Sequence, residues 1–184
     1  MKIYVISDTH LGHDKLVELS GRPADFSDKI LLNLERTSGD LLIHCGDFCI
    51  GQDEQNHKLF MNATSGFKKR VLVRGNHDKK SDTWYLNHGW DMVCEIFWGN
   101  YFGKQIIFSH MPIMKKNVGT FSPHFPPDIN VHGHLHGCND RHGYCTELYD
   151  KKWFYDVAPD TNKYAPVSLI EIIKEINYEN KLNI

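Results

Sequence analysis

The chain has 184 residues, of which 24% are charged, and its formal net charge at pH 7 is -2. This length favours one compact domain over residues 1–184. The nearly balanced charge supplies no whole-protein field to hold a polyanion, which argues against strong binding to duplex nucleic acid. Composition leaves the oligomeric state open.

The N-terminus predicts a cytoplasmic protein with no membrane contact. From Met1 the chain enters a strand directly, without the charged and apolar regions of a signal peptide. No apolar stretch approaches the roughly 20 residues that a membrane-spanning helix needs. The five cysteines are odd in number and are not spaced as a disulfide framework, so we expect reduced thiols.

The first half of the chain alternates strands with amphipathic helices. Strands are predicted at Ile3–Ser7, Leu41–Cys45 and Val71–Val73, and helices at Ser27–Arg36 and Glu54–Ala63. This βαβαβ order predicts a parallel sheet.

The second half predicts shorter strands that form a second, more antiparallel sheet. They are expected at Met92–Phe97, Gln105–Ser109, Asn130–His132 and Trp153–Val157. A final helix beginning near Ser168 is expected to close the edge of the domain. The predicted fold is therefore an α/β sandwich of two sheets, with the loop Asn117–Asp128 bordering the site.

Five short polar blocks follow five of the apolar runs, so each block is expected at the end of a strand, where α/β sheets bind ligands. The blocks are Asp8-Thr9-His10, Gly46-Asp47, Gly75-Asn76-His77-Asp78, Ser109-His110 and Gly133-His134-Leu135-His136. The chain has twelve histidines, and at least four of them lie in these blocks, which favours metal binding.

The residue types in these blocks suit two divalent transition metals. Asp8 and His10 can converge on one ion, and a mixed carboxylate and imidazole pair fits Mn, Fe or Zn better than Ca or Mg. Asp47 has two carboxylate oxygens and can bridge two cations. Further ligands are expected from a neutral amide and from imidazoles. These are Asn76, His110, His134 and His136.

Two such ions yield hydroxide near neutral pH and neutralise phosphate oxygens, which predicts a phosphoester hydrolase. His77 is placed to protonate the leaving alkoxide, and Asp78 is expected to hold the other nitrogen of that imidazole. Asn76 and His77 are expected to contact the substrate. His13 follows the first ligands closely, and it is predicted either to touch the substrate or to be a solvated loop histidine.

The order D-x-H, G-D, G-N-H-D, a lone His and G-H-x-H resembles the calcineurin-like metallophosphoesterase superfamily from Asp8 to His136. The resemblance implies a four-layer αββα sandwich with His77 as the general acid. It also implies that Asp8, His10, Asp47 and His136 hold one metal, and that Asp47, Asn76, His110 and His134 hold the other.

A second resemblance, to small bacterial and phage-type members of the superfamily, is carried by Asp8-Thr9-His10-Leu11-Gly12-His13, Asp156-Val157-Ala158-Pro159-Asp160 and Pro166-Val167-Ser168. This match implies no defined physiological substrate.

We therefore expect a phosphodiesterase with two divalent ions, Mn favoured, that cleaves a small phosphoester or nucleotide by in-line attack of a metal-bridging hydroxide. One alternative is a nuclease acting on DNA or RNA. Another is a non-catalytic metal-binding scaffold that docks a protein, as one retromer subunit of the superfamily does. His77 favours the enzyme, because such scaffolds lose the acid or a ligand.

The remaining histidines and cysteines are assigned structural roles. His44 and His132 alternate with exposed or ligand positions on strands and are expected in the core. Four others stand in polar surroundings and are expected at the surface. They are His57, His88, His124 and His142. A zinc cluster of Cys138, His142 and Cys145 with His136 is not expected, because the spacing matches no standard C-x₂-C arrangement and His136 is already assigned as a ligand.

Overall fold

The computed structural model describes residues 1–113, 127–137 and 150–181. The predictions for Cys138, His142 and Cys145, for His124 and for most of the loop 117–128 lie outside these residues. Within the described residues, no helix has the length and apolar character that crossing a membrane requires.

The first sheet has five strands in the order β4-β3-β2-β1-β9. Their bounds are β1 Ile3–Ile6, β2 Gly39–His44, β3 Phe67–Val73, β4 Met92–Cys94 and β9 Val167–Ser168. The pairings of β1 with β2 and of β2 with β3 are parallel, as the βαβαβ pattern predicts. β4 is also parallel to β3, which was not predicted, and β9 is antiparallel to β1.

The second sheet has four strands in the order β5-β6-β7-β8. They are β5 Ile96–Tyr101, β6 Lys104–Ser109, β7 Ile129–His132 and β8 Phe154–Asp156. Only β5 and β6 pair antiparallel, whereas β6 pairs with β7 and β7 with β8 in parallel. The predicted antiparallel character is therefore wrong for two pairings. The reason is that residues 110–128 and 133–153 are long enough for the crossovers that parallel strands require.

One predicted strand divides between the two sheets. Residues Met92–Phe97 were expected as a single strand, but β4 belongs to the first sheet and β5 to the second. Glu95 lies between them and is exposed. The chain therefore passes from one sheet to the other at this residue.

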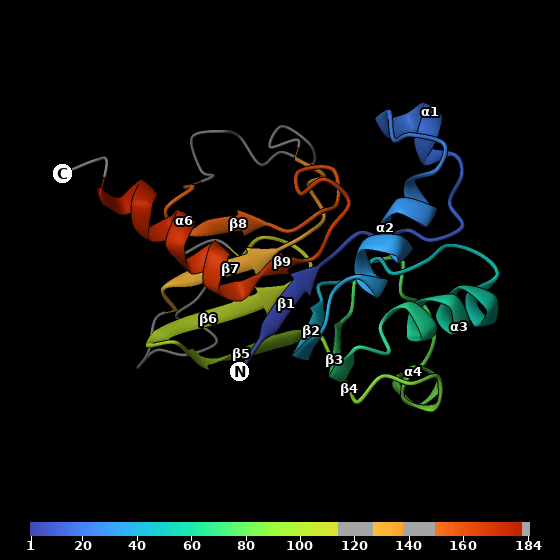
Figure 1. The fold of residues 1–184 in the computed structure, drawn as a ribbon, viewed down its shortest axis with the longest axis horizontal. Coiled ribbons are helices and arrows are strands. Elements are labelled where there is room, and N and C mark those ends of the chain that lie inside the picture. Colours follow the sequence, from blue (N-terminus) through green and yellow to red (C-terminus); the bar gives the residue numbers. More distant parts are fainter. Residues whose placement is uncertain (114–126, 138–149, 182–184) are drawn as a thin grey trace.

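Four helices of the described residues precede β4. They are α1 Leu16–Ser20, α2 Phe26–Glu35, α3 Asp53–Ala63 and α4 Asp82–Asn87. Helices α2, α3 and α4 lie beside the first sheet, whereas the short α1 lies above α2 and farther from the sheet (Figure 1). Phe26, Ile30 and Leu34 recur at helical spacing in α2 and are all buried, which gives this helix the amphipathic character predicted for it. The helices α1 and α4 were not predicted, because five or six residues are too few to show a periodic pattern.

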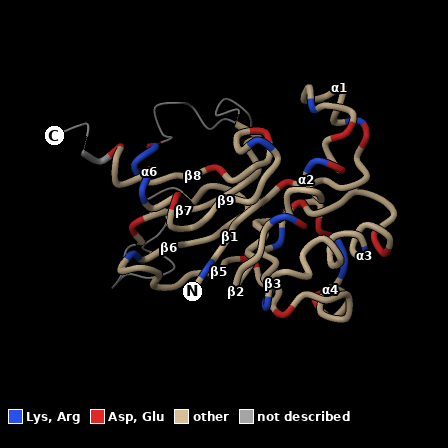
Figure 2. The backbone as a smooth tube through the Cα atoms, viewed as in Figure 1, with Lys and Arg blue, Asp and Glu red and all other residues tan. Residues whose placement is uncertain are grey.

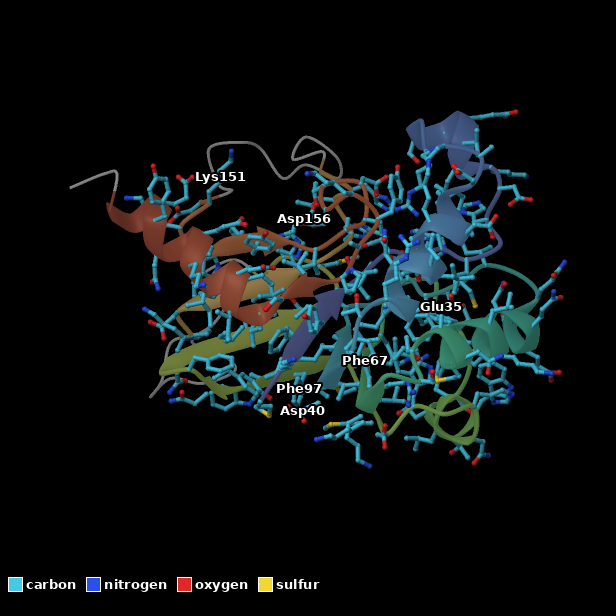
Figure 3. The ribbon with its side chains drawn as sticks, viewed as in Figure 1. Glu35, Asp40, Phe67, Phe97, Lys151 and Asp156 are labelled. Atoms are coloured by element: carbon cyan, nitrogen blue, oxygen red, sulfur yellow. The ribbon has the colours of Figure 1, made fainter. Side chains whose placement is uncertain are left out.

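The described residues form two large hydrophobic cores, besides a small cluster of Trp153 and Phe154. One fills the space between the sheets and is closed by helix α6 (Leu169–Lys181), whose Leu169, Ile172 and Ile176 pack into it. The other lies between the first sheet and helices α2 to α4. Phe97 packs against the first core and Phe67 belongs to the second; both are labelled in Figure 3. Two mixed sheets with flanking helices confirm the predicted α/β sandwich.

The second core can be tested at α3, where a buried residue has an exposed neighbour. Phe60 is fully buried against Phe48 and Trp90, while Leu59 is 44% exposed. We expect Phe60→Ala to lower the free energy of unfolding by about 3–5 kcal/mol, because it leaves a cavity. Leu59→Ala should change it by less than about 1 kcal/mol. Urea denaturation measures both values, and equal losses would contradict this packing.

Candidate metal centre

The carboxyl ends of β1, β2, β3, β6 and β7 lead directly into the five polar blocks. Where the chain leaves these strands the backbone turns sharply, and five of the predicted ligands have positive φ angles. They are Asp8 (47°), His10 (44°), Asp47 (55°), His134 (72°) and His136 (51°). Residues with side chains seldom adopt this conformation, and it costs of order 1–3 kcal/mol per residue. Such clustering of strain is typical of a functional site.

Glycines in these blocks leave room for the ligand carboxylates. A Cβ atom on Gly75 would overlap Oδ1 of Asp47, and one on Gly133 would overlap Oδ2 of Asp8. Each carboxylate therefore lies directly against the backbone of another block. Any larger residue at either glycine would displace a predicted ligand.

The first ligand group consists of Asp8, His10 and His136, whose candidate ligand atoms lie within 4.8 Å of one another. Asp8 Oδ1 is 3.8 Å from His10 Nε2 and 3.4 Å from His136 Nε2. Asp8 Oδ2 accepts a hydrogen bond of 2.9 Å from the backbone N–H of His134. One oxygen of Asp8 thus fixes the neighbouring block, and the other faces the two imidazoles.

The second group consists of Asp47, His110 and His134, which are all buried. His110 Nε2 lies 3.4 Å from Asp47 Oδ2, 3.1 Å from His134 Nδ1 and 2.9 Å from Asn76 Oδ1. His110 Nδ1 lies 2.9 Å from the carbonyl oxygen of Cys45. Because that carbonyl can only accept a hydrogen bond, Nδ1 carries the proton and Nε2 is left as a ligand atom.

Asp47 joins the two groups. Its Oδ2 is 3.4 Å from His110 Nε2 in the second group and 3.7 Å from His10 Nε2 in the first. Its Oδ1 accepts the backbone N–H of His77 at 2.8 Å. The structure therefore brings all seven predicted ligands together, with one carboxylate oxygen between the two groups.

The donor atoms fit a divalent cation. Metal–ligand bonds of about 2.0–2.2 Å place neighbouring ligand atoms about 3–3.5 Å apart, close to the separations found here. Asp8 Oδ1 is buried and has no hydrogen-bond partner among the described residues. A buried carboxylate oxygen without a donor is costly, and a bound cation would remove that cost.

The charges of the site favour a cation as well. Burial alone would lower the pKa of His110, but its hydrogen bond to Asp47 and the charges of Asp8 and Asp47 outweigh burial and raise that pKa to about 9. At His10 burial dominates and lowers the pKa to about 2. The two carboxylates therefore stabilise positive charge at His110, in the second group, whereas burial prevails at His10.

His77 lies at the open side of the centre. Its side chain is 48% exposed, and its Nε2 is 3.9 Å from Asp47 Oδ2. His13 is half-buried, with its ring centroid 5.9 Å from that of His10. Both imidazoles therefore border the two ligand groups from the solvent side.

Asp78 occupies a different position from the one expected. Its carboxylate accepts hydrogen bonds from the backbone N–H groups of Asp47 (2.9 Å), Phe48 (3.1 Å) and Gly75 (2.7 Å). Between the described side chains of Asp78 and His77 there is no hydrogen bond. The predicted contact with the His77 ring is absent because backbone donors already engage both carboxylate oxygens, and Asp78 instead fastens two ligand loops together.

Two residues of the site were missed by the sequence analysis. Arg22 is buried in the turn before α2, and its Nε and Nη2 donate to Asp160 Oδ1 (2.9 Å) and Oδ2 (2.6 Å). Asp160 Oδ2 in turn lies 3.0 Å from His136 Nδ1. Nothing in the segment Gly21-Arg22-Pro23 signals this role. Asp160 enters the sequence analysis only as part of the segment 156–160 that resembles small bacterial and phage-type members of the superfamily, and no function is predicted for it.

Asp156, labelled in Figure 3, shapes the loop that carries Asp160. Its Oδ1 accepts the N–H of Ala158 at 2.8 Å and its Oδ2 accepts the N–H of Gly137 at 2.9 Å. The same carboxylate therefore ties the residue after His136 to the turn that precedes Asp160.

The burial of three other histidines can be compared with the positions predicted for them from the sequence. His44 and His132 are fully buried, as predicted; the backbone N–H of Gly46 donates to His44 Nδ1 at 3.1 Å. The prediction that His57 lies at the surface is wrong, because it is 1% exposed and packs 4.2 Å from the ring of Phe48. The polar neighbours of His57 in the sequence concealed its place on the buried face of α3.

Comparison with known proteins agrees with this geometry. The sequence model of the calcineurin-like phosphoesterases matches residues 1–171. The chain is 27% identical to the uncharacterized protein MJ1445 of Methanocaldococcus jannaschii, over 95% of this chain and 91% of that one. The crystal structure of AQ665, a protein of unknown function from Aquifex aeolicus, superposes with a TM-score of 0.73 at 26% identity, covering 94% of this chain and 98% of that one.

The position of Asp47 between the two ligand groups can be tested by measuring metal binding. We expect Asp47→Asn to weaken Mn²⁺ binding at both groups, because Oδ2 faces ligands of each. Isothermal titration of metal-free protein with Mn²⁺ measures this. The control is Asp25→Asn, at an exposed residue that pairs only with Lys29, and it should bind like the wild type. Wild-type binding by Asp47→Asn would contradict the shared role.

Proposed function

The chain belongs to the calcineurin-like phosphoesterase family, and from this premise we propose that it is a phosphodiesterase that uses two divalent transition-metal ions, with manganese favoured. The observation that carries the proposal is the position of Asp47 Oδ2 between the two ligand groups. Asp8, His10 and His136 would hold one ion, Asn76, His110 and His134 the other, and Asp47 both.

Two bound ions would lower the pKa of a water molecule and offset the charge that builds on the phosphate oxygens. Hydroxide attacks phosphorus in line with the leaving oxygen, and the phosphorus–oxygen bond on the opposite side breaks. The electron pair of that bond stays on the leaving alkoxide, which takes a proton from His77. The products are a phosphomonoester and an alcohol.

Several contacts support His77 as the proton donor. Its backbone N–H is held by Asp47 Oδ1, so a ligand of the centre positions this residue directly. Its half-exposed ring lies 5.6 Å from the ring of His10, within reach of a phosphate bound between the two groups. We propose that His13 and Asn76 contact the bound phosphate from the same open side.

The arginines near the site support a diester substrate. A doubly charged monoester is commonly clamped by free guanidinium groups. Arg22 is fully buried and bound to Asp160. Arg74 donates to the carbonyl oxygens of Asp78 and Lys80 and pairs with Asp82. Neither of these described arginines is available to a phosphate.

The surroundings of His77 support a small leaving group. A hollow of about 270 Å³ adjoins His77, between residues 49–51, the start of α3 and Tyr85, with the exposed Lys79 at its rim. This volume is at the low end for ligand pockets. Along the described part of the backbone, Lys and Arg are interspersed with Asp and Glu, without a long basic stripe for a polynucleotide (Figure 2). We propose a small cytoplasmic phosphodiester as substrate.

The proposal is tested by His77→Ala. We expect this variant to bind Mn²⁺ like the wild type but to hydrolyse a dialkyl phosphodiester about 10²–10⁴ times more slowly, because the alkoxide leaves without a proton. With a p-nitrophenyl phosphodiester, whose p-nitrophenolate leaves readily as an anion, the loss of hydrolysis rate should be much smaller. Rates with both esters give the comparison.

His88→Ala is the matched control, since His88 stacks on Trp84 in α4 rather than at the centre. It should hydrolyse both esters at the wild-type rate. Hydrolysis of the dialkyl ester by His77→Ala at the wild-type rate would show that His77 is not the acid.

A further inference from the structure

Arg22 is a buried cation that holds part of the metal centre in place. Its side chain has no exposed surface, so its charge needs a close partner. Asp160 supplies that partner through two parallel hydrogen bonds, the strongest arrangement for arginine and carboxylate. Arg22 Nη2 also donates to the carbonyl oxygen of Asp8 at 2.9 Å.

The protons of Nη2 determine the tautomer of His136. Nη2 has two hydrogens, and these are directed to Asp160 Oδ2 at 2.6 Å and to Asp8 O at 2.9 Å. His136 Nδ1 lies 3.0 Å from both Nη2 and Asp160 Oδ2. Because no proton of Nη2 remains for it, Nδ1 must carry its own proton and donate to Asp160. Nε2 is then the ring nitrogen that remains for a metal ion, and it faces Asp8 Oδ1 at 3.4 Å.

The same arginine also supports the backbone of Asp8, a residue with a φ of 47°. Nη2 and Nη1 donate to the carbonyl oxygens of Asp8 and Thr9, the latter at 3.4 Å. Arg22 and Asp160 therefore act on two of the three ligands in the first group.

The second group is oriented by other contacts. The carbonyl oxygen of Cys45 fixes the tautomer of His110, and Asp78 holds the loop of Asp47 by its backbone N–H. Among the described residues, no hydrogen bond connects Arg22 or Asp160 to a side chain of the second group.

We propose that Arg22 and Asp160 are positioning residues that set the metal affinity of the group Asp8, His10 and His136 without setting that of the group Asp47, His110 and His134. This inference rests on the metal binding in the proposed function. Removing a partner that orients a metal-binding histidine commonly weakens metal binding about 10- to 100-fold. The two groups therefore have separately adjustable affinities.

The first test counts Mn²⁺ ions in Asp160→Asn by isothermal titration. Asparagine has the same shape, but it lacks the charge, and its amide can place a donor where His136 needs an acceptor. We expect one site to weaken about 10- to 100-fold and the other to stay within about twofold of the wild type. Equal weakening of both sites, or of neither, would overturn the inference.

Two double variants identify which metal site Asp160→Asn weakens. Combined with His110→Ala, which disables the second group, Asp160→Asn should weaken the remaining ion. Combined with His136→Ala, which disables the first group, it should leave the affinity for the ion of the second group unchanged to within about twofold. The reverse pattern would overturn the assignment.

A readout on the metal-free wild-type protein needs no substitution. The ¹⁵N chemical shifts of the His136 ring distinguish a protonated Nδ1 from a protonated Nε2. We expect a proton on Nδ1, and a ring protonated only at Nε2 would overturn the inference even if the variants fold poorly. A wild-type protein that binds no divalent ion would overturn the proposed function as well, whereas two ions with no selective effect of Asp160→Asn would overturn only this inference.

Discussion

The arrangement of the centre depends on one carboxylate, that of Asp47. Oδ2 lies between imidazoles from both ligand groups, while Oδ1 is bound to the backbone N–H of His77. To reach this place Asp47 adopts a left-handed backbone conformation and lies directly against Gly75. Asp78, through its bonds to the N–H groups of Asp47 and Gly75, keeps these two loops together. The cost of the strained backbone is offset by the hydrogen bonds that Asp47 forms with His77 and Asp78 and by one from the backbone N–H of His10 to the carbonyl oxygen of Asp47.

The fold explains how such distant blocks meet. Parallel strands end at the same edge of a sheet, so β1, β2 and β3 deliver Asp8, Asp47 and Asn76 side by side. The second sheet brings His110 and His134 from β6 and β7, which are also parallel. The apolar core between the sheets sets the distance between these two sets of loops. The unexpected parallel pairing of β6 with β7 is therefore what places both histidines at the same edge.

The candidate ligands that the structure brings together, and most strands, could be predicted from the sequence, because both depend on local patterns. Asp8 and His10 follow an apolar run, and this context repeats at every block. Partners that come from elsewhere in the chain left no such pattern. Arg22 and Asp160 are 138 positions apart, so their pairing depends on tertiary packing alone. Asp78 follows His77 in sequence, yet its carboxylate turns to backbone donors of another loop. The direction of β7 was missed since strand periodicity is the same for both pairing directions.

We propose that hydrolysis requires a metal ion at both ligand groups. The most direct test titrates Mn²⁺ into metal-free protein while the hydrolysis of bis-p-nitrophenyl phosphate and of p-nitrophenyl phosphate is followed. We expect activity to appear as the second equivalent of Mn²⁺ binds, and we expect the diester to react faster than the monoester. Full activity at one equivalent, or two bound ions without turnover of either ester, would contradict this proposal.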